Sequence, residues 1–442
     1  MSNIKKVLCT MALILPTFTA LAQTNGSNSP YSRYGFGLLG DGAQGFNKGM
    51  GGVAYGFSSN RDLNFKNPAS YSAIDSLSLV FDIGLTLQNA NIGTSRHKTN
   101  ARNTSLDHVN VGFRAAKNLG VSLGLRPFST IGYSISQDES NSLNSGEITQ
   151  TDVYKGDGGL HEVYIGAGWR PFKPIAIGVN VGYLWGEMTH NVTASFSDAT
   201  IYSRRREYAA NISTYKLGFG LQYYQPISKK LSLTIGAAYQ LGHEIDNAAK
   251  YYDQKLSSSA VITADTQFVK KAFQLPHTFG AGVMVNYKNK LKVGLDYTFQ
   301  KWKDVKSPEL NAKTGLYESV KGAFSNSHKM ALGAEFIPNP ESMHWGSHVR
   351  YRAGVSYTTP YLRINNGDGP ASYAASIGVA LPLIKTHGTY RATTYQNCNL
   401  LNFSAQFERV QPKHSWQIAE NYIRFTIGIT FNERWFQKWK VE

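Results

Sequence analysis

Large apolar residues alternate with small or polar residues along most of this chain. From Leu77 to Gln88 the odd-numbered positions are Leu, Leu, Phe, Ile, Leu and Leu, whereas the even-numbered positions are mostly Ser, Asp, Gly, Thr and Gln. A period of two residues is typical of a β-strand, because successive side chains of a strand point to opposite faces. The pattern recurs up to Phe431 and predicts about 14 strands.

The face opposite the large residues carries Gly, Ser, Thr, Asn, Gln and scattered charges of both signs in the predicted strands, among them Asp296, Glu335 and Arg352. Glycine fills a packed core poorly, so this composition suits the wet or plugged lumen of a membrane barrel whose apolar faces touch lipid. Each run has about 9 to 13 residues, the length of a tilted strand that crosses a bilayer. An open sheet edge is not tolerated in hydrocarbon, so the sheet must close. The sequence therefore predicts an all-β fold, a 14-stranded antiparallel transmembrane β-barrel over residues 76–431.

The connections between the predicted strands alternate in length, as they do in outer-membrane barrels. The short connections are 116–120, 170–174, 225–230 and 287–290. The long connections are 89–105, 137–159, 191–207, 246–267 and 304–320. Residues 383–397 are the exception. They form a long connection at a position in the order where a short turn is expected.

The first 22 residues have the features of a signal peptide. Lys5 and Lys6 precede an apolar run, and Ala20-Leu21-Ala22 forms a small-x-small cleavage site, so residues 1–22 are predicted to be removed and Gln23 to become the N-terminus. No later stretch approaches the roughly 20 apolar residues of a membrane-spanning helix. We therefore expect an exported protein in the cell outer membrane.

The charge and cysteine content restrict which surfaces the protein contacts and which sites it can form. Loss of two lysines with the signal peptide lowers the net charge from +16 to +14. In an exported barrel this basic balance favours contact with membrane lipids and lipopolysaccharide over nucleic acid. Cys398 is the single cysteine after residue 22, which excludes an internal disulfide and a cysteine-based zinc site.

The segments at both ends of the predicted barrel lack its alternation. Residues 23–75 are rich in Gly, Ser, Asn and aromatic residues, too aromatic for a disordered tail, and the lumen of a 14-stranded barrel needs filling. We predict that they form a hatch that plugs the lumen. Residues 432–442 form a basic, Trp-bearing tail that either docks a periplasmic partner or covers a strand edge.

Motifs at the two ends carry a family resemblance. The Gly-rich stretch 49–56, the Asn67-Pro68-Ala69 step before the first strand, the strand count and the ending around 427–436 resemble the FadL/TodX-type family of outer-membrane transporters of hydrophobic compounds, in its Bacteroidota branch. The resemblance implies passive uptake of a hydrophobic, fatty-acid-like small molecule. It also implies a lateral exit into the bilayer at a kink in the third strand.

The resemblance directs attention to the third strand and the hatch. Pro127 is the candidate lateral portal, because proline removes a hydrogen-bond donor from a strand; the alternative is that Pro127 lies beyond the membrane portion and only bends the outer segment of the strand. The candidate ligand-lining residues are the hatch aromatics and the neighbours of Pro127, namely Phe36, Phe46, Tyr55, Phe57, Arg126 and Phe128. Arg126 is a candidate partner for a ligand carboxylate. The four hatch aromatics alternatively form the core of the plug itself.

Enzyme motifs are absent or lack their structural context. Gly35 to Gly40 matches the dinucleotide fingerprint by letters, but no strand precedes it and no helical pattern follows. The sequence has no phosphate loop, zinc helix or nucleophile elbow. We therefore predict no enzymatic activity, no cofactor and no metal, although a hydrolase site assembled from distant barrel residues would escape such a search.

A second function is compatible with the same fold. The polar, charged lumen and the C-terminal tail favour a barrel that does not transport and instead serves as a scaffold subunit of an outer-membrane assembly or secretion complex, with protein partners in that complex.

Overall fold

The computed structural model describes residues 28–434 except 77, 94–97, 144–145, 199, 258–259, 312, 315, 366 and 384–397. The predicted signal peptide, most of the tail at 432–442 and the exceptional connection at 384–397 lie outside the described residues. None of the helices in the described part is long and apolar enough to span a bilayer.

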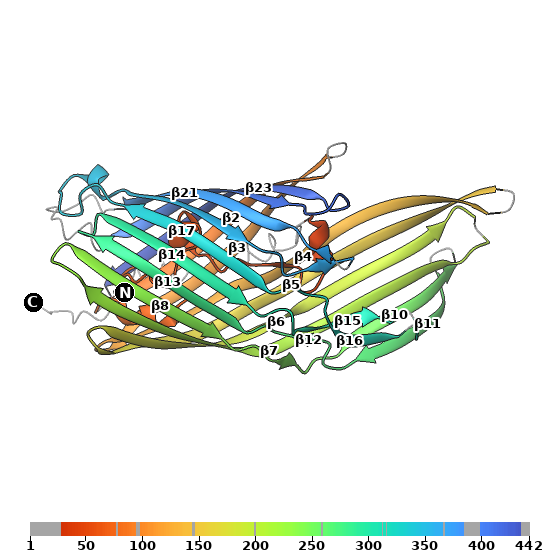
Figure 1. The fold of residues 1–442 in the computed structure, drawn as a ribbon, viewed down its shortest axis with the longest axis horizontal. Helices are drawn as coiled ribbons and strands as arrows, with labels where there is room; N and C mark the ends of the chain where they lie inside the picture. The colour runs from red at the N-terminus through yellow and green to blue at the C-terminus, as the bar shows by residue number, and fades with distance from the viewer. Residues whose placement is uncertain are drawn as a thin grey trace, which may run out of the picture.

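Fourteen antiparallel strands close into a barrel, as the sequence predicts (Figure 1). They are β2 (Ser78–Gly93), β3 (Lys98–Ala116), β4 (Leu119–Leu143), β5 (Gly146–Phe172), β6 (Ile175–Phe196), β7 (Ser203–Pro226), β8 (Leu231–Gln240), β13 (Thr278–Tyr287), β14 (Leu291–Gln300), β17 (Ser327–Phe336), β18 (Arg350–Thr358), β21 (Ala371–Leu383), β22 (Asn399–Gln411) and β23 (Ala419–Arg434). The last strand pairs with the first from Ser78↔Arg434 to Gly93↔Ala419, which leaves the ring without an open edge.

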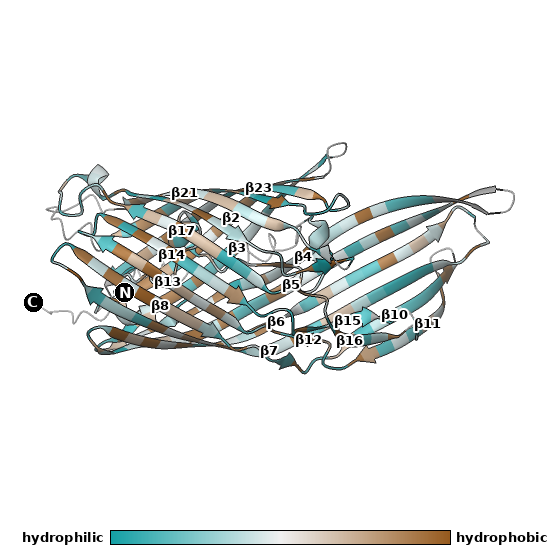
Figure 2. Ribbon diagram, viewed as in Figure 1, coloured by the Kyte–Doolittle hydropathy of each residue, from teal (hydrophilic) through white to brown (hydrophobic). Residues whose placement is uncertain are grey.

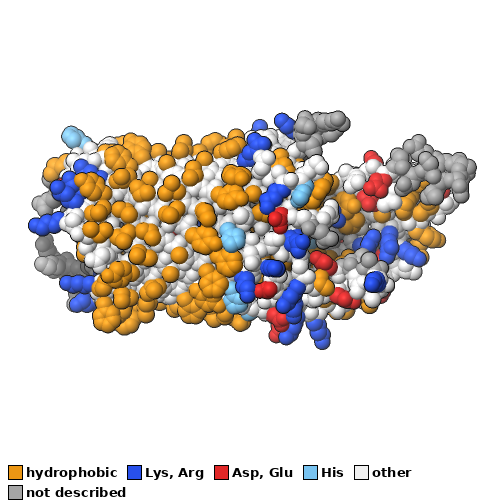
Figure 3. All heavy atoms as spheres, viewed as in Figure 1, with side chains coloured by type: hydrophobic (Ala, Val, Ile, Leu, Met, Phe, Trp, Pro, Cys, Tyr) orange, Lys and Arg blue, Asp and Glu red, His pale blue; other side chains and the backbone are white. Residues whose placement is uncertain are grey.

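The outward face of the barrel is apolar over the half that holds the short turns. We call this end the turn end and the opposite end the loop end. Figure 2 shows hydrophobic residues concentrated along the turn-end half of the ribbon, and on the face seen in Figure 3 apolar side chains cover that half, whereas charged side chains gather toward the loop end. Exposed large residues such as Ile165, Leu295, Ile377 and Phe425 belong to this belt. A closed barrel with an apolar belt is the form in which a β-sheet spans a membrane.

At the loop end β4 to β7 run past the apolar belt and form an extension (Figure 1). Two further strands join it, β10 (Ala249–Ser257) on β7 and β11 (Ala260–Val269) on β10. The sequence predicted long loops at 137–159, 191–207 and 246–267, and this was wrong for most of these residues because they are paired strands. Outside the hatch, the short elements of the described chain are β9 (Glu244–Ile245), β12 (Phe273–Gln274), β15 (Lys306–Leu310), β16 (Tyr317–Lys321), β19 (Arg363–Ile364), β20 (Gly367–Asp368) and η3 (Trp345–His348).

The inner face of the extension covers a hydrophobic core and a stack of rings. The stack runs across five elements, with ring centroids 5.8 Å apart for Tyr133 and His190, 5.2 Å for His190 and Tyr208, 5.1 Å for Tyr208 and Tyr251, and 3.7 Å for Tyr251 and Tyr317. The hydroxyl of Tyr133 also forms a 2.9 Å hydrogen bond with Nδ1 of His190. Burial, with the nearby charge of Arg33, lowers the pKa of His190 to about 4.

The low pKa of His190 predicts that the extension loses stability in acid. His190 binds a proton near pH 6.5 in the unfolded chain and only near pH 4 in the folded extension. Its contribution to the free energy of unfolding is therefore complete above pH 6.5 and is lost as the pH falls to 4. With partial exposure of the ring, we expect a loss of roughly 2 kcal/mol between pH 7 and pH 4.5. Hydrogen-exchange protection of β6, β7 and β10, corrected for the intrinsic pH dependence of exchange, measures it. His190→Phe should keep the stack and abolish this pH dependence; an equal loss in that variant would contradict the assignment.

The hatch occupies the lumen and is built from short elements. It contains η1 (Pro30–Arg33), β1 (Leu38–Leu39), α2 (Gly45–Lys48) and η2 (Pro68–Ala73). The side chain of Asn67 accepts a hydrogen bond from the backbone N–H of Ala69, and Pro68 occupies the first position of η2, so the predicted Asn67-Pro68-Ala69 motif is a helix start. The hatch begins beside β4 and β23 near the loop end and reaches the turn-end half of β5 to β7 at η2.

Candidate functional site: the contact between hatch and barrel wall

The inward-facing glycines of the wall lie directly against the hatch. A Cβ atom built on Gly236 would overlap the carbonyl group of Tyr55, and one on Gly120 would overlap that of Tyr71. Each would come closer than 3.0 Å, a separation that real Cβ atoms essentially never show. The same holds for Gly168, Gly178, Gly220, Gly280, Gly294, Gly333 and Gly354, which meet hatch atoms around the ring. The glycine-rich face thus serves the close approach of two backbones.

Polar side chains of the wall bond to the hatch backbone. One carboxylate oxygen of Asp296 accepts hydrogen bonds from the backbone N–H groups of Ala54 at 2.6 Å and Tyr55 at 3.0 Å. The amide of Gln222 donates to the carbonyl oxygens of Tyr55 and Phe57, both at 3.0 Å. Sequence reasoning placed Asp296 on the inward face and passed over Gln222. The available signal was a polar residue directly after the inward-facing glycines Gly218 and Gly220.

Further bonds of this kind lie on other strands. The amide of Asn180 donates to the carbonyl oxygen of Phe65 at 3.0 Å, and the hydroxyl of Ser376 accepts from the backbone N–H of Gly51 at 2.9 Å. Each bond contributes about 1 kcal/mol net, and leaving such a buried group unpaired costs about 1–3 kcal/mol. The hatch is therefore held from several sides of the ring.

Buried charges form networks between wall and hatch. Glu335 bonds to Arg352 at 2.8 Å and to Lys292 at 3.0 Å, and Arg350 bridges Glu335 and the hatch residue Asp62 at 3.8 and 3.3 Å. The side chain of Glu335 is 0% exposed. Buried charges are tolerated when they are paired, so these contacts tie the hatch to the wall. This agrees with the mixed signs of the inward-facing charges.

Arg126 belongs to a second network. Its guanidinium lies 2.9 Å from Glu162, whose carboxylate also binds Lys216 at 2.9 Å, and it stacks 3.5 Å from the ring centre of the hatch residue Phe65. This guanidinium already has a carboxylate and an aromatic ring as partners inside the protein.

The four hatch aromatics lie at three separate places. Phe46 and Phe57 stack with centroids 4.4 Å apart, and they pack with two other hatch residues and two wall residues. Phe36 lies 0% exposed in the loop-end core beside Trp302, and the Tyr55 hydroxyl bonds to Thr298 at 2.9 Å. The structure does not bring these rings into one chamber, and they pack as the interface between hatch and wall.

Pro127 marks the point where two neighbouring strands separate. The pairing of β3 with β4 runs from the turn end to Val109↔Leu125 and stops there, whereas β4 stays paired with β5 across a bulge at Pro127. Beyond it the hatch strand β1 pairs with Ser129 and Thr130 of β4, and the N–H of Gly40 donates to the Phe128 carbonyl oxygen at 2.8 Å. The ring of Phe128 meets Phe36 edge-on at 6.3 Å. A strand of the hatch thus covers this part of the seam.

The hatch motif is anchored near the turn end. The amide of Asn67 donates to the carbonyl oxygens of Tyr55 at 2.8 Å and of Leu221 at 3.1 Å, so it ties two parts of the hatch to β7. Pro68 and Ala69 rest on the wall glycine Gly178.

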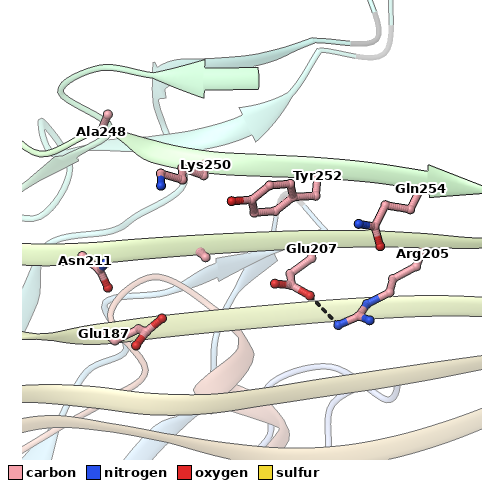
Figure 4. A pocket seen from close by; sticks show the side chains of 9 residues that line it. Glu187, Arg205, Glu207, Asn211, Ala248, Lys250, Tyr252 and Gln254 are labelled. Carbon is pink, nitrogen blue, oxygen red and sulfur yellow. Dashed lines mark hydrogen bonds and ion pairs between the residues drawn. The ribbon is translucent and has the colours of Figure 1, made fainter. Parts of the chain in front are cut away.

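Two cavities of the described structure are polar or very small. A groove of about 450 Å³ lies on the outward face of the extension, between side chains of β6, β7 and β10 (Figure 4). Its lining includes Tyr252, Lys250 and the ion pair of Arg205 with Glu207 at 2.6 Å. A void of about 10 Å³ lies between Phe65 of the hatch and the wall, room for about one water molecule. The groove is too polar and the void too small to hold a hydrophobic ligand.

The described residues contain no group of three or more His, Cys, Asp or Glu placed to hold a metal ion.

The fold and the lumenal hatch define a FadL-like barrel of the outer-membrane type. The TodX toluene transporter of Pseudomonas putida superposes with a TM-score of 0.61 at 14% identity, covering 90% of this chain and 100% of that chain. A FadL homologue of Pseudomonas aeruginosa gives 0.59 at 11% identity, covering 88% and 98%. The Ralstonia pickettii toluene transporter TbuX gives 0.57 at 14% identity, covering 89% and 98%. Identities this low show the fold alone.

The sequence family of this chain differs from that of the transporters whose fold it shares. The BamG family model matches residues 3–442, so this chain belongs to the BamG family. No curated protein matches its sequence. The comparisons indicate no enzyme family.

Two predictions from the sequence are corrected by this family match. Membership of the FadL/TodX-type transporter family was wrong, although the shared fold explains the resemblance. Passive uptake of a fatty-acid-like ligand with an exit near Pro127 was also wrong as the main function. A hatch whose backbone rests on wall glycines and is bonded from several strands agrees with that correction.

Proposed function

We propose that this protein is a non-transporting barrel subunit of the outer-membrane β-barrel assembly machinery. The observation that carries the proposal is the BamG family match over nearly the whole chain. The seated hatch supports it, because a plug fastened by buried hydrogen bonds and ion pairs keeps the lumen filled and makes barrel and hatch one rigid body. The proposal includes no catalytic step, cofactor or metal.

The proposal places the barrel in the outer membrane with its turn end toward the periplasm. Outer-membrane barrels have short periplasmic turns and longer extracellular connections, and the apolar belt lies on the turn-end half. In this orientation the belt contacts lipid and the extension of β4 to β7 stands outside the bilayer among the lipopolysaccharide sugars. The protein partners are the other subunits of the same machinery.

Affinity purification from native outer membranes tests the proposal. We expect the tagged barrel, extracted in mild detergent, to carry other outer-membrane and periplasmic subunits at constant stoichiometry through size-exclusion chromatography. A tagged unrelated barrel from the same membranes controls for detergent carry-over. Recovery of the whole population as a lone barrel would contradict the scaffold function, and recovery with bound fatty acids and no protein would restore the transport hypothesis.

A further inference from the structure

Six lysines stand at the turn end of one side of the barrel. The turns after β3, β5, β7 and β13 contain only 11 residues, 117–118, 173–174, 227–230 and 288–290, and six of these are lysine. They are Lys117, Lys173, Lys229, Lys230, Lys288 and Lys290. The same 11 positions contain no Asp or Glu. We call this set the lysine rim.

The lysine rim is continuous. Each turn bonds to the next through the backbone, from Arg170 to Asn118 at 2.9 Å, from Tyr224 to Pro174 at 2.7 Å and from Lys288 to Lys230 at 2.7 Å. The lysines therefore follow one arc of neighbouring turns. Five of the six are exposed and Lys290 is half-buried.

The lysines of the rim lack acidic partners, in contrast with cations at the loop end. There Lys306 binds Glu244 at 2.6 Å, Lys413 binds Asp368 at 3.2 Å, and Arg204 binds Asp253. In the described part of the chain none of the six rim lysines has a carboxylate within 4.0 Å. Figure 3 shows this difference, with blue but no red side chains at the turn end and both colours at the loop end.

The lysines are also densest on one side of the turn end. The connection from β17 to β18, at 337–349, is longer than the four rim turns together, yet it contains Glu341 and neither Lys nor Arg. Residues 384–397, which lie outside the described residues, contain Lys385 and Arg391 as the only Lys or Arg among 14 residues. Lipid surrounds a barrel on all sides, so cations that served only lipid phosphates would be spread evenly around the circumference. A dense charge arc on four neighbouring turns fits a partner that approaches from one side.

We propose that the lysine rim is a docking face for the acidic surface of a soluble periplasmic protein. This inference rests on the proposed function, because it assigns a surface to one contact inside the same assembly. Unpaired like charges close together are unfavourable until an oppositely charged surface covers them, and such surfaces steer and orient encounter. Each exposed ion pair contributes only about 0.2–1 kcal/mol, so the contact needs several lysines at once and weakens with salt.

Charge reversal of the rim in the full-length protein tests the proposal. We expect Lys229→Glu, Lys230→Glu, Lys288→Glu and Lys290→Glu, combined, to lower co-purification of one soluble acidic subunit at least tenfold. The same positions changed to arginine should retain it. From the unchanged barrel, raising the salt from 50 to 500 mM should release the same subunit.

A second variant with an equal change of charge is the control. Lys255, Lys270, Lys303 and Lys313 are exposed at the loop end and form no ion pair in the described structure, and their replacement by glutamate should leave co-purification unchanged. Heat-modifiable gel mobility shows that both variants are folded barrels.

Three outcomes overturn the inference. If the rim variant retains all subunits and loses only co-purified anionic phospholipid, the rim is a lipid anchor. If it retains subunits and lipid alike, the rim has no docking role, although the scaffold function stands. If the unchanged protein carries no subunit, the scaffold function and the docking face fail together.

Discussion

Gly236→Ala will unseat the hatch and destabilise the protein by about 3–5 kcal/mol. The new methyl group would occupy the position of the Tyr55 carbonyl, which is backbone and has no rotamer that moves it aside. Relief requires the Tyr55–Gly56 turn of the hatch to move off the wall, which lengthens the hydrogen bonds that Gln222 and Asp296 make there. Overpacking costs about 1–3 kcal/mol, and each disturbed buried hydrogen bond adds about 1 kcal/mol.

Gly346→Ala is the matched control, because nothing lies within 4 Å of the Cβ position at Gly346. Urea unfolding of both variants in the same detergent gives the free energies, and trypsin cleavage after Lys48 or Lys66 reports release of the hatch. Conductance across a planar bilayer adds an independent readout, since a displaced hatch opens a path for ions. Equal unfolding midpoints for Gly236→Ala and Gly346→Ala would show that the hatch is loosely seated.

A firmly seated hatch explains how a transporter-like fold serves another function. Transport through the lumen requires the plug to move or to leave a path, and every wall glycine that touches hatch backbone makes such movement more costly. The same contacts make the barrel stiff, which is useful in a subunit whose outer surfaces position other proteins. Under the proposed scaffold function, the surfaces open to other subunits are the two ends of the barrel, the lysine rim and the extension.

The barrel was predictable from sequence because the lipid belt imposes a strong two-residue period. The extension was missed because that period changes phase outside the membrane. Along β7 the outward side chains are apolar at Phe219 and Leu221 but charged at Glu207 and Arg205, while the inward ones change from glycine to apolar residues such as Ile212. Water outside and a packed core inside reverse the belt pattern, so paired strands resembled polar loops.

The candidate site was predictable only in part. The sequence identified a hatch rich in glycine and aromatic residues, and it placed charges such as Asp296 and Glu335 on the inward face. It did not reveal which wall residue meets which hatch residue, because those pairs are far apart in the chain, 241 residues for Tyr55 and Asp296. The sequence also did not predict that Phe36 and Phe46 lie in different hydrophobic clusters, because an irregular segment follows no period along the lumen.

Glu335→Gln will destabilise the protein by about 3–5 kcal/mol, the usual cost of breaking a buried ion pair from one side. The carboxylate of Glu335 is 0% exposed and compensates Lys292, Arg350 and Arg352, so a neutral amide would leave two buried arginines and the half-buried Lys292 with Asp62 as their remaining anion. Since Arg350 links this cluster to the hatch through Asp62, part of the loss should appear as faster proteolysis of the hatch.

Glu341→Gln is the matched control, because it makes the same chemical change at an exposed side chain six residues further along the chain. Glu341 is exposed and forms no ion pair in the described part of the chain, so Glu341→Gln should cost less than about 0.5 kcal/mol. Adding Lys292→Met to Glu335→Gln removes one of the uncompensated cations, and the double variant should recover part of the lost unfolding free energy, a coupling that unrelated sites do not show. A double variant whose losses simply add, or a Glu335→Gln variant as stable as Glu341→Gln, would mean that water reaches the cluster and that the ion network does not hold the hatch.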